Sequence, residues 1–211
     1  MILKLKKFYN QISIVKKATI WFLICSILQK GIAFLTTPIF TRLMTTEQYG
    51  QYSIYITWFQ ILTLLTSFRL DYAVFNKGMS KYENNKDLYT STMQVVTTFI
   101  TIILFIIYVL FRKTLNKFTG LTTFLSVLMF INVLFMNAIS FWSIRERYDY
   151  KYKSVVIVTL LLTFVTTIIS VIAVVTSENK GITRIVSLAI TQIIIGIVIY
   201  IYIIKKRKTN F

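Results

Sequence analysis

Six long apolar runs constrain this chain more than any other feature of its sequence. A transmembrane helix needs about 20 consecutive, mostly apolar residues, and every run reaches that length. We expect membrane-spanning helices at 18–44, 50–70, 90–111, 121–142, 154–176 and 182–204. The connections between them are too short to fold as soluble domains. The sequence therefore predicts an all-α, polytopic membrane helix bundle in one transmembrane domain, 18–204, flanked by a basic arm, 1–17, and a basic tail, 205–211.

The charges of the chain are mostly positive and lie mainly outside these runs. Lys and Arg total 24 against seven Asp and Glu, and 56% of the residues are hydrophobic. Basic residues beside apolar spans face anionic membrane lipids, so we expect lipids as partners and no nucleic acid. On alternating sides of the six spans, 17 basic residues fall on the side of the termini and six on the other. The positive-inside rule therefore predicts that both termini are cytoplasmic.

One lysine lies inside the first apolar run, in the stretch SILQKGIAFLTTPIF. Lys30 follows the previous basic residue, Lys17, by thirteen positions, which is about 20 Å along a helix. A charge near the middle of a bilayer costs about 3 kcal/mol on insertion scales. All seven acidic residues lie in connections or at span ends. We expect Lys30 to line a hydrated cavity that receives an anionic substrate group; the alternative is a structural lysine in a polar pocket between helices.

Polar and small residues recur at helical spacing in the first and third runs. The first run carries Thr19, Ser26, Lys30, Ala33, Thr37 and Thr41, and the third carries Thr90, Gln94, Thr97, Thr98 and Thr101. Residues at this spacing share one helix face, which we expect to turn toward protein or water. The alternative for each hydroxyl is a bond to its own helix or to a neighbouring helix.

Four further residues of the first two spans have predicted roles. Pro38 lacks a backbone donor, and we expect it to kink the first helix. Arg42, Arg69 and Asp71 lie at span ends, where they are candidates for contact with the substrate together with Lys30. Membrane anchoring is the alternative for Arg69.

Several chemical functions lack the residues that they need. The chain has no histidine and a single cysteine, Cys25, which removes the usual general base and the usual metal ligands. It also has no phosphate-binding G-x-x-x-x-G-K-[ST] loop and no nucleophile elbow. We therefore predict a protein that is not an enzyme and that binds no metal or cofactor.

The stretch TTPIFTRLMTTEQYGQYSIYITWFQILTLLTSFRLDYAV, from 36 to 74, resembles the start of a known family. It is similar to Wzx-type oligosaccharide-lipid flippases (polysaccharide biosynthesis proteins) of the multidrug/oligosaccharidyl-lipid/polysaccharide exporter superfamily. The residues that carry the resemblance are Pro38, Thr41, Arg42, Leu43, Thr45, Glu47, Tyr49, Gly50, Leu70 and Asp71. Beyond Asn76 only the hydropathy pattern agrees.

The resemblance implies transport of undecaprenyl-diphosphate-linked oligosaccharide across the bacterial plasma (inner) membrane, for O-antigen or capsule biosynthesis. Members of the family fold as two six-helix lobes around a central cavity, and this chain has the length of the N-terminal lobe alone. A partner is therefore expected, either a second six-helix lobe or a second copy in a homodimer. Two alternatives stay open: a non-transporting membrane subunit of a polysaccharide-assembly complex, and an inactive truncated remnant.

Overall fold

The computed structural model describes residues 13–68, 70 and 73–208, and all regular structure in these ranges is helical. The helices are α2 (Ile14–Leu43), α3 (Thr46–Ser67), α4 (Ala73–Lys81), the 3₁₀-helix η1 (Glu83–Asn85), α5 (Lys86–Leu110), α6 (Arg112–Thr119), α7 (Thr123–Tyr148), α8 (Tyr152–Thr176) and α9 (Lys180–Lys208). The all-α prediction is thus confirmed for the described part of the chain.

Five helices of the described chain are long and apolar enough to cross a membrane. These segments are Ile14–Leu43, Glu83–Leu110, Thr123–Tyr148, Tyr152–Thr176 and Lys180–Lys206. The chain is therefore a multi-pass membrane protein. The remaining expected span, 50–70, largely coincides with α3, a helix of 22 residues that begins with the polar stretch TEQYGQYS. Because of that polar start, a membrane crossing by α3 stays a prediction.

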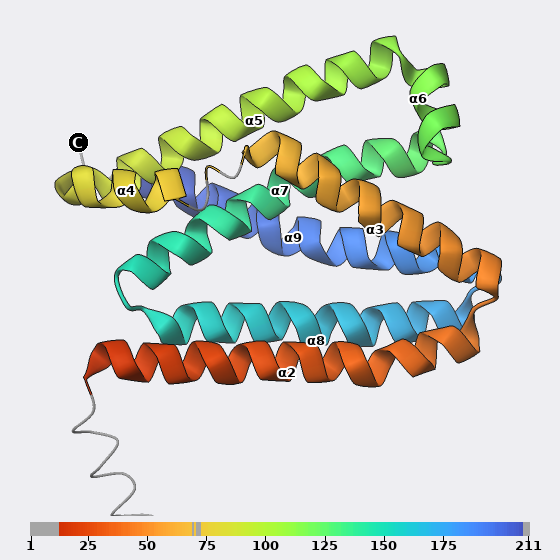
Figure 1. Ribbon diagram of the computed structural model, residues 1–211, viewed down its shortest axis with the longest axis horizontal. Helices are drawn as coiled ribbons and strands as arrows, with labels where there is room; N and C mark the ends of the chain where they lie inside the picture. Colours follow the sequence, from red (N-terminus) through yellow and green to blue (C-terminus); the bar gives the residue numbers. More distant parts are fainter. Residues whose placement is uncertain (1–12, 69, 71–72, 209–211) are drawn as a thin grey trace, which may run out of the picture.

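The long helices run back and forth between two ends of the molecule (Figure 1). At the end that we call the charged end, α2 and α5 begin and α7 and α9 finish. At the opposite end lie the α2–α3 and α8–α9 connections and the short helix α6. Helices α2 and α8 pack together as one layer, α7 and α9 cross in the middle, and α3 and α5 lie on the other side of that crossing.

Two apolar clusters hold the middle of the bundle. In the first, Tyr55 of α3 packs with Leu125 and Val133 of α7 and with Ile185 of α9, and all four are fully buried. In the second, helices α7, α8 and α9 meet through Ala138, Trp142, Val155, Ile199 and Ile203. Helices α7 and α9 take part in both clusters, so they form the axis on which the other helices pack.

Glycine permits the close crossing of α7 and α9. A Cβ atom added at Gly196 would lie 2.6 Å from the Cβ atom of Phe135 and 2.9 Å from its carbonyl oxygen. Small residues let membrane helices approach closely in this way. Gly31 of α2 differs, because a Cβ atom there would meet nothing within 4 Å.

The polar face of α5 is buried, as the spacing of its residues predicts. Thr90, Gln94, Thr97 and Thr101 are each at most 3% exposed. The Thr97 hydroxyl donates to the Gln94 carbonyl oxygen (3.1 Å), and the Thr101 hydroxyl donates to the Thr97 carbonyl oxygen (2.7 Å). Membrane helices commonly satisfy hydroxyl groups in this way, and the face is then free to pack against protein.

Helix α2 lies at the edge of the bundle and packs mainly on α8. Its packed side repeats every three or four residues, through Ala18, Phe22, Cys25, Gln29, Ile32, Thr36 and Phe40. Within this stripe the Gln29 side-chain amide donates to the Thr163 hydroxyl of α8 (3.2 Å). Most of the remaining circumference of α2 is exposed.

Two short amphipathic helices lie at the two ends of the bundle. Helix α4, near the charged end, buries Phe75 and Met79 completely against Phe141. Helix α6, at the opposite end, carries Lys113 and Lys117 as exposed residues. Such helices lie in the interfacial region of a membrane, with the apolar side turned inward. From the sequence, both segments were expected only as connections between spans.

The close crossing at Gly196 gives a stability prediction. Gly196→Ala should destabilise the fold by about 1–3 kcal/mol, because the added methyl group has no room beside the Phe135 backbone. Gly31→Ala, also inside a helix, is the matched control and should leave stability unchanged or slightly raised. Thermal unfolding of both purified variants in detergent measures the difference. Equal melting temperatures would contradict a close α7–α9 crossing.

Candidate functional site

Lys30 lies on an exposed side of α2, away from the residues that pack on α8. It is 16 residues from the start of α2 and 13 from its end, which is about 24 Å and 20 Å along the axis, respectively. Lys30 is exposed, and among the described residues it has no ion pair within 4.0 Å. The structure thus places a charge near the middle of the helix without a carboxylate partner in the described chain.

The other polar residues of the same stripe are also exposed. Ser26, Thr37 and Thr41 donate to carbonyl oxygens of their own helix, those of Phe22, Ala33 and Pro38, at 2.9, 2.7 and 3.0 Å. The alternative given for these hydroxyls, a hydrogen bond to their own helix, therefore applies to all three. Their polarity nevertheless gives α2 one side that is less apolar than a lipid-facing side.

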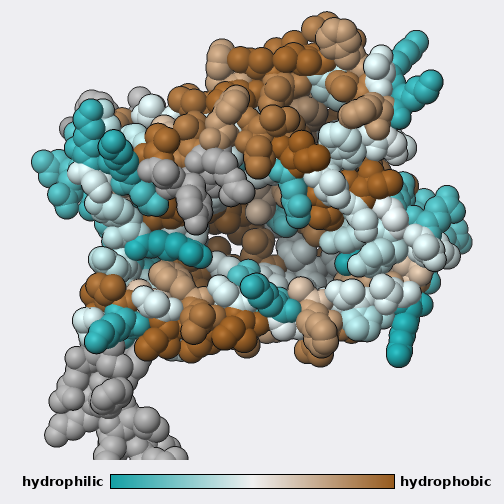
Figure 2. Space-filling view, viewed as in Figure 1, coloured by the Kyte–Doolittle hydropathy of each residue, from teal (hydrophilic) through white to brown (hydrophobic). Residues whose placement is uncertain are grey.

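A hollow separates two groups of helices. Figure 2 shows a depression between the α2–α8 layer and the helices above it, bordered by teal and pale residues. Helix α3, which meets α2 at the short connection around Thr45, carries exposed Ser53, Thr57 and Gln60 at helical spacing. The two helices separate beyond that connection (Figure 1). Both helices therefore carry exposed polar groups.

The structure does not bring Arg42 to Lys30. Arg42 is exposed at the end of α2, twelve residues from Lys30, which is about 18 Å along the helix. Arg69 and Asp71 lie outside the described residues. Pro38 lies inside α2, which continues to Leu43, and the last turns of that helix incline toward α3 (Figure 1).

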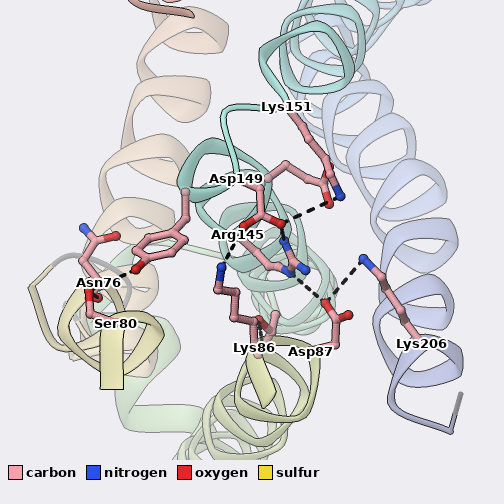
Figure 3. Close-up of polar contacts among 11 residues, drawn as sticks. Asn76, Ser80, Lys86, Asp87, Arg145, Asp149, Lys151 and Lys206 are labelled. Carbon is pink, nitrogen blue, oxygen red and sulfur yellow. Dashed lines mark hydrogen bonds and ion pairs between the residues drawn. The ribbon is translucent and has the colours of Figure 1, made fainter. Parts of the chain in front are cut away.

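A network of ion pairs joins three helices at the charged end (Figure 3). Arg145 of α7 donates from Nε to Asp87 of α5 (2.7 Å) and from Nη1 to Asp149, which follows α7. Lys206 of α9 reaches Asp87 (3.4 Å), and Lys86 reaches Asp149 (3.1 Å). The Arg145 side chain is only 10% exposed. Breaking a buried ion pair leaves an uncompensated charge, so this network fixes the ends of α5, α7 and α9 relative to one another.

The environment of Asp149 favours its ionised form. Burial acts to raise the pKa of Asp149, but the hydrogen bonds from Arg145 and Lys86 outweigh burial and hold that pKa below its ordinary value. Asp149 therefore stays ionised at neutral pH and keeps its two basic partners in place.

At the opposite end, a buried arginine is enclosed by aromatic rings. The guanidinium carbon of Arg184, on α9, lies 3.6 Å from the ring centre of Tyr52, 3.8 Å from that of Phe40 and 5.3 Å from that of Tyr49. Arg184 is 8% exposed. Guanidinium groups stack on aromatic faces with an attraction that grows as water is removed. Arg184 thereby fastens the α2–α3 corner to α9.

Amide side chains pair in the interior of the bundle. Asn132 of α7 donates to Gln192 of α9 (3.0 Å), and Asn137 of α7 donates to Thr66 of α3 (3.1 Å). The Oδ1 atom of Asn132 and the hydroxyl of Tyr55 have no hydrogen-bond partner in the described structure. These bonds hold α7 to two neighbouring helices.

Sequence reasoning missed the ion-pair network and the Arg184 site. It counted Arg145 and Arg184 only as charges that set orientation. The i, i+4 spacing of Arg145 and Asp149 on a helix was a readable signal for one pair. The pairing with Asp87, 58 residues away, depends on tertiary packing, as does the meeting of Arg184 with Phe40 and Tyr52.

The ion-pair network gives a second stability prediction. Arg145→Gln should lower the free energy of unfolding by about 3 kcal/mol, because Asp87 and Asp149 lose their shared partner in a buried site. Arg147→Gln is the control: Arg147 is exposed and lies 4.6 Å from the Phe22 ring centre, so its loss should cost less than about 1 kcal/mol. Denaturant unfolding of both variants measures the difference, and equal losses would show that the network does not hold the helices.

Comparison with known proteins gives one match. The family model described as "Polysaccharide biosynthesis protein" matches residues 15–211. A search of curated proteins found no match, and neither did a search of solved structures. The match spans most of the chain, including all five apolar helices that are long enough to cross a membrane. The chain therefore belongs to the polysaccharide biosynthesis protein family.

Proposed function

We propose that this protein translocates a lipid-linked oligosaccharide, carried on undecaprenyl diphosphate, from the cytoplasmic to the outer leaflet of the bacterial plasma membrane. The cargo supplies a surface polysaccharide such as O-antigen or capsule. The role is transport and not catalysis. Family membership supports a part in polysaccharide synthesis or export, and the resemblance of residues 36–74 supports the flippase.

The observation that carries the proposal is the position of Lys30. The head group of the cargo bears a diphosphate, and moving its charge through hydrocarbon is costly because ions lose their hydration there. A lysine near the middle of a spanning helix, exposed and without a carboxylate partner among the described residues, can offset that cost. The exposed hydroxyl groups of Ser26, Thr37 and Thr41 lie on the same side of α2.

We propose that the described helices make one half of the transport path. Helix α2 lies at the edge of the bundle, and the side of it that carries Lys30 is exposed. A second six-helix lobe, or a second copy of this chain, would face it and enclose the cargo. In this arrangement α3 is the sixth span, and both termini are cytoplasmic, as the distribution of basic residues predicts.

Loss of the gene is the first test of the proposed transport. Deletion should cause lipid-linked oligosaccharide to accumulate on the cytoplasmic face while surface polysaccharide falls. Leaflet-specific labelling of the lipid-linked sugar, together with quantification of surface polysaccharide, measures both effects. Unchanged polysaccharide without accumulation would contradict transport and would favour a non-transporting subunit or an inactive remnant.

Substitution of Lys30 tests the proposed contact with the diphosphate. Lys30→Ala should reduce complementation of the deletion at least tenfold at normal abundance in the membrane, and Lys30→Arg should retain part of the activity because it keeps the positive charge. Lys16→Ala is the matched control, since Lys16 is an exposed lysine at the start of the same helix. If all three variants complement like the wild type, Lys30 has no role in transport.

A further inference from the structure

An apolar groove lies between α3, α5 and α7, beneath the short helix α6. Its volume is about 220 Å³, and none of the residues that line it is charged. The walls include Trp58, Leu65, Ile107 and Met129, and Leu115 of α6 lies at its end. Leu65 is 45% exposed and Ile107 is 44% exposed. The groove therefore opens sideways, between α3 and α5, toward the surface that lipid covers.

Two hydrogen bonds through Asn116 hold helix α6 over the end of this groove. The Tyr108 hydroxyl donates to Asn116 Oδ1 (2.9 Å), and Asn116 Nδ2 donates to the Thr123 hydroxyl (2.8 Å). The ring centres of Phe118 and Trp58 lie 5.5 Å apart. Asn116 thus connects α6 to both α5 and α7, and the position of α6 relative to the groove is fixed.

The charge above the groove is positive and uncompensated. Arg112, Lys113 and Lys117 lie on α6, and no acidic residue occurs between Asp87 and Glu146 in the sequence. All three are exposed, and among the described residues none has a carboxylate within 4.0 Å. Lys113 and Lys117 are four residues apart, so they share one face of α6, which lies opposite to Leu115 on a helix of 3.6 residues per turn.

We propose that this groove and α6 together bind one anionic phospholipid. An acyl chain occupies the groove, and the phosphate of the head group contacts Lys113 and Lys117 at the membrane surface. The apolar lining matches a hydrocarbon chain, and the basic, acid-free helix above it matches an anionic head group. A cavity of about 150 Å³ with similar lining admits one benzene molecule, so 220 Å³ has room for a segment of a chain, with the remainder in the bilayer.

Native mass spectrometry of the intact chain in detergent tests the head-group contact. Titration with phosphatidylglycerol should show one retained lipid, with an affinity at least tenfold higher than for phosphatidylcholine of the same chains. Each lysine near a membrane surface contributes about fivefold to binding an anionic lipid. The double variant Lys113→Gln/Lys117→Gln should therefore weaken phosphatidylglycerol binding about 20-fold. The matched control is Lys77→Gln/Lys81→Gln, two exposed lysines at the same spacing on α4, and it should change binding less than twofold.

A second pair of variants tests the groove itself. Leu65→Trp should fill the groove and reduce retention of both lipids at least fivefold. Leu64→Trp should have no effect, because Leu64 is 48% exposed, similar to Leu65, but does not line the groove. All six substituted positions are exposed, so the variants should fold.

Three outcomes would overturn the proposal. Equal losses of phosphatidylglycerol affinity in the α4 and α6 double variants would mean that basic residues attract anionic lipid non-specifically. Equal retention by the Leu64 and Leu65 variants would exclude the groove as the chain site. Retention of a polyprenyl phosphate in preference to phosphatidylglycerol would show that the occupant is an isoprenoid lipid instead. The inference does not depend on transport, since each readout is binding alone.

Discussion

The central constraint on this protein is the cost of placing charge where water is scarce. Within a bilayer, polar groups must find partners inside the protein or face a hydrated space. The described structure obeys this rule at both ends, where Arg145 is paired with two carboxylates and Arg184 is enclosed by aromatic rings. Lys30 lies between the ends and has no such partner in the described chain. The account of function depends on this difference.

The two ends and the middle of the bundle have different structural roles. The ion-pair network holds α5, α7 and α9 at the charged end, and Arg184 holds the α2–α3 corner to α9 at the opposite end. Between them, the close crossing at Gly196 keeps α7 and α9 in contact. Helix α2 has one packed side and a broad exposed side. The packed helices thus present the exposed side of α2, with Lys30 on it, to the proposed second half of the transport path.

The sequence predicted the helices well because their signals are local. Apolar runs of sufficient length located the helices near their observed positions, and the Thr90–Thr101 spacing correctly predicted a buried face on α5. The two short helices, α4 and α6, were missed. They have only nine and eight residues, and their mixture of apolar and polar residues resembles that of a connection between spans. Helix α3 was harder to classify, because its polar first part lowers its overall apolarity.

The site was only partly predictable, because pairing depends on residues distant in sequence. Lys30 could be singled out from its position in an apolar run, and the structure leaves it unpaired in the described chain. The contacts of Arg145 with Asp87 and of Arg184 with Phe40 could not be read from spacing, since they join helices that the chain brings together only on folding. Arg42 illustrates the reverse case, because its nearness to Lys30 in sequence does not place it at the same site.

The hydration of the α2 face that carries Lys30 tests the account most directly. In a Cys25→Ala background, Lys30→Cys and Leu28→Cys place a thiol on different sides of α2, both at exposed positions. We expect a water-soluble, membrane-impermeant thiol reagent to modify position 30 at least tenfold faster than position 28 in native membranes. Equal and slow modification at both positions would mean that Lys30 faces lipid, and the proposed path for an anionic head group would be wrong.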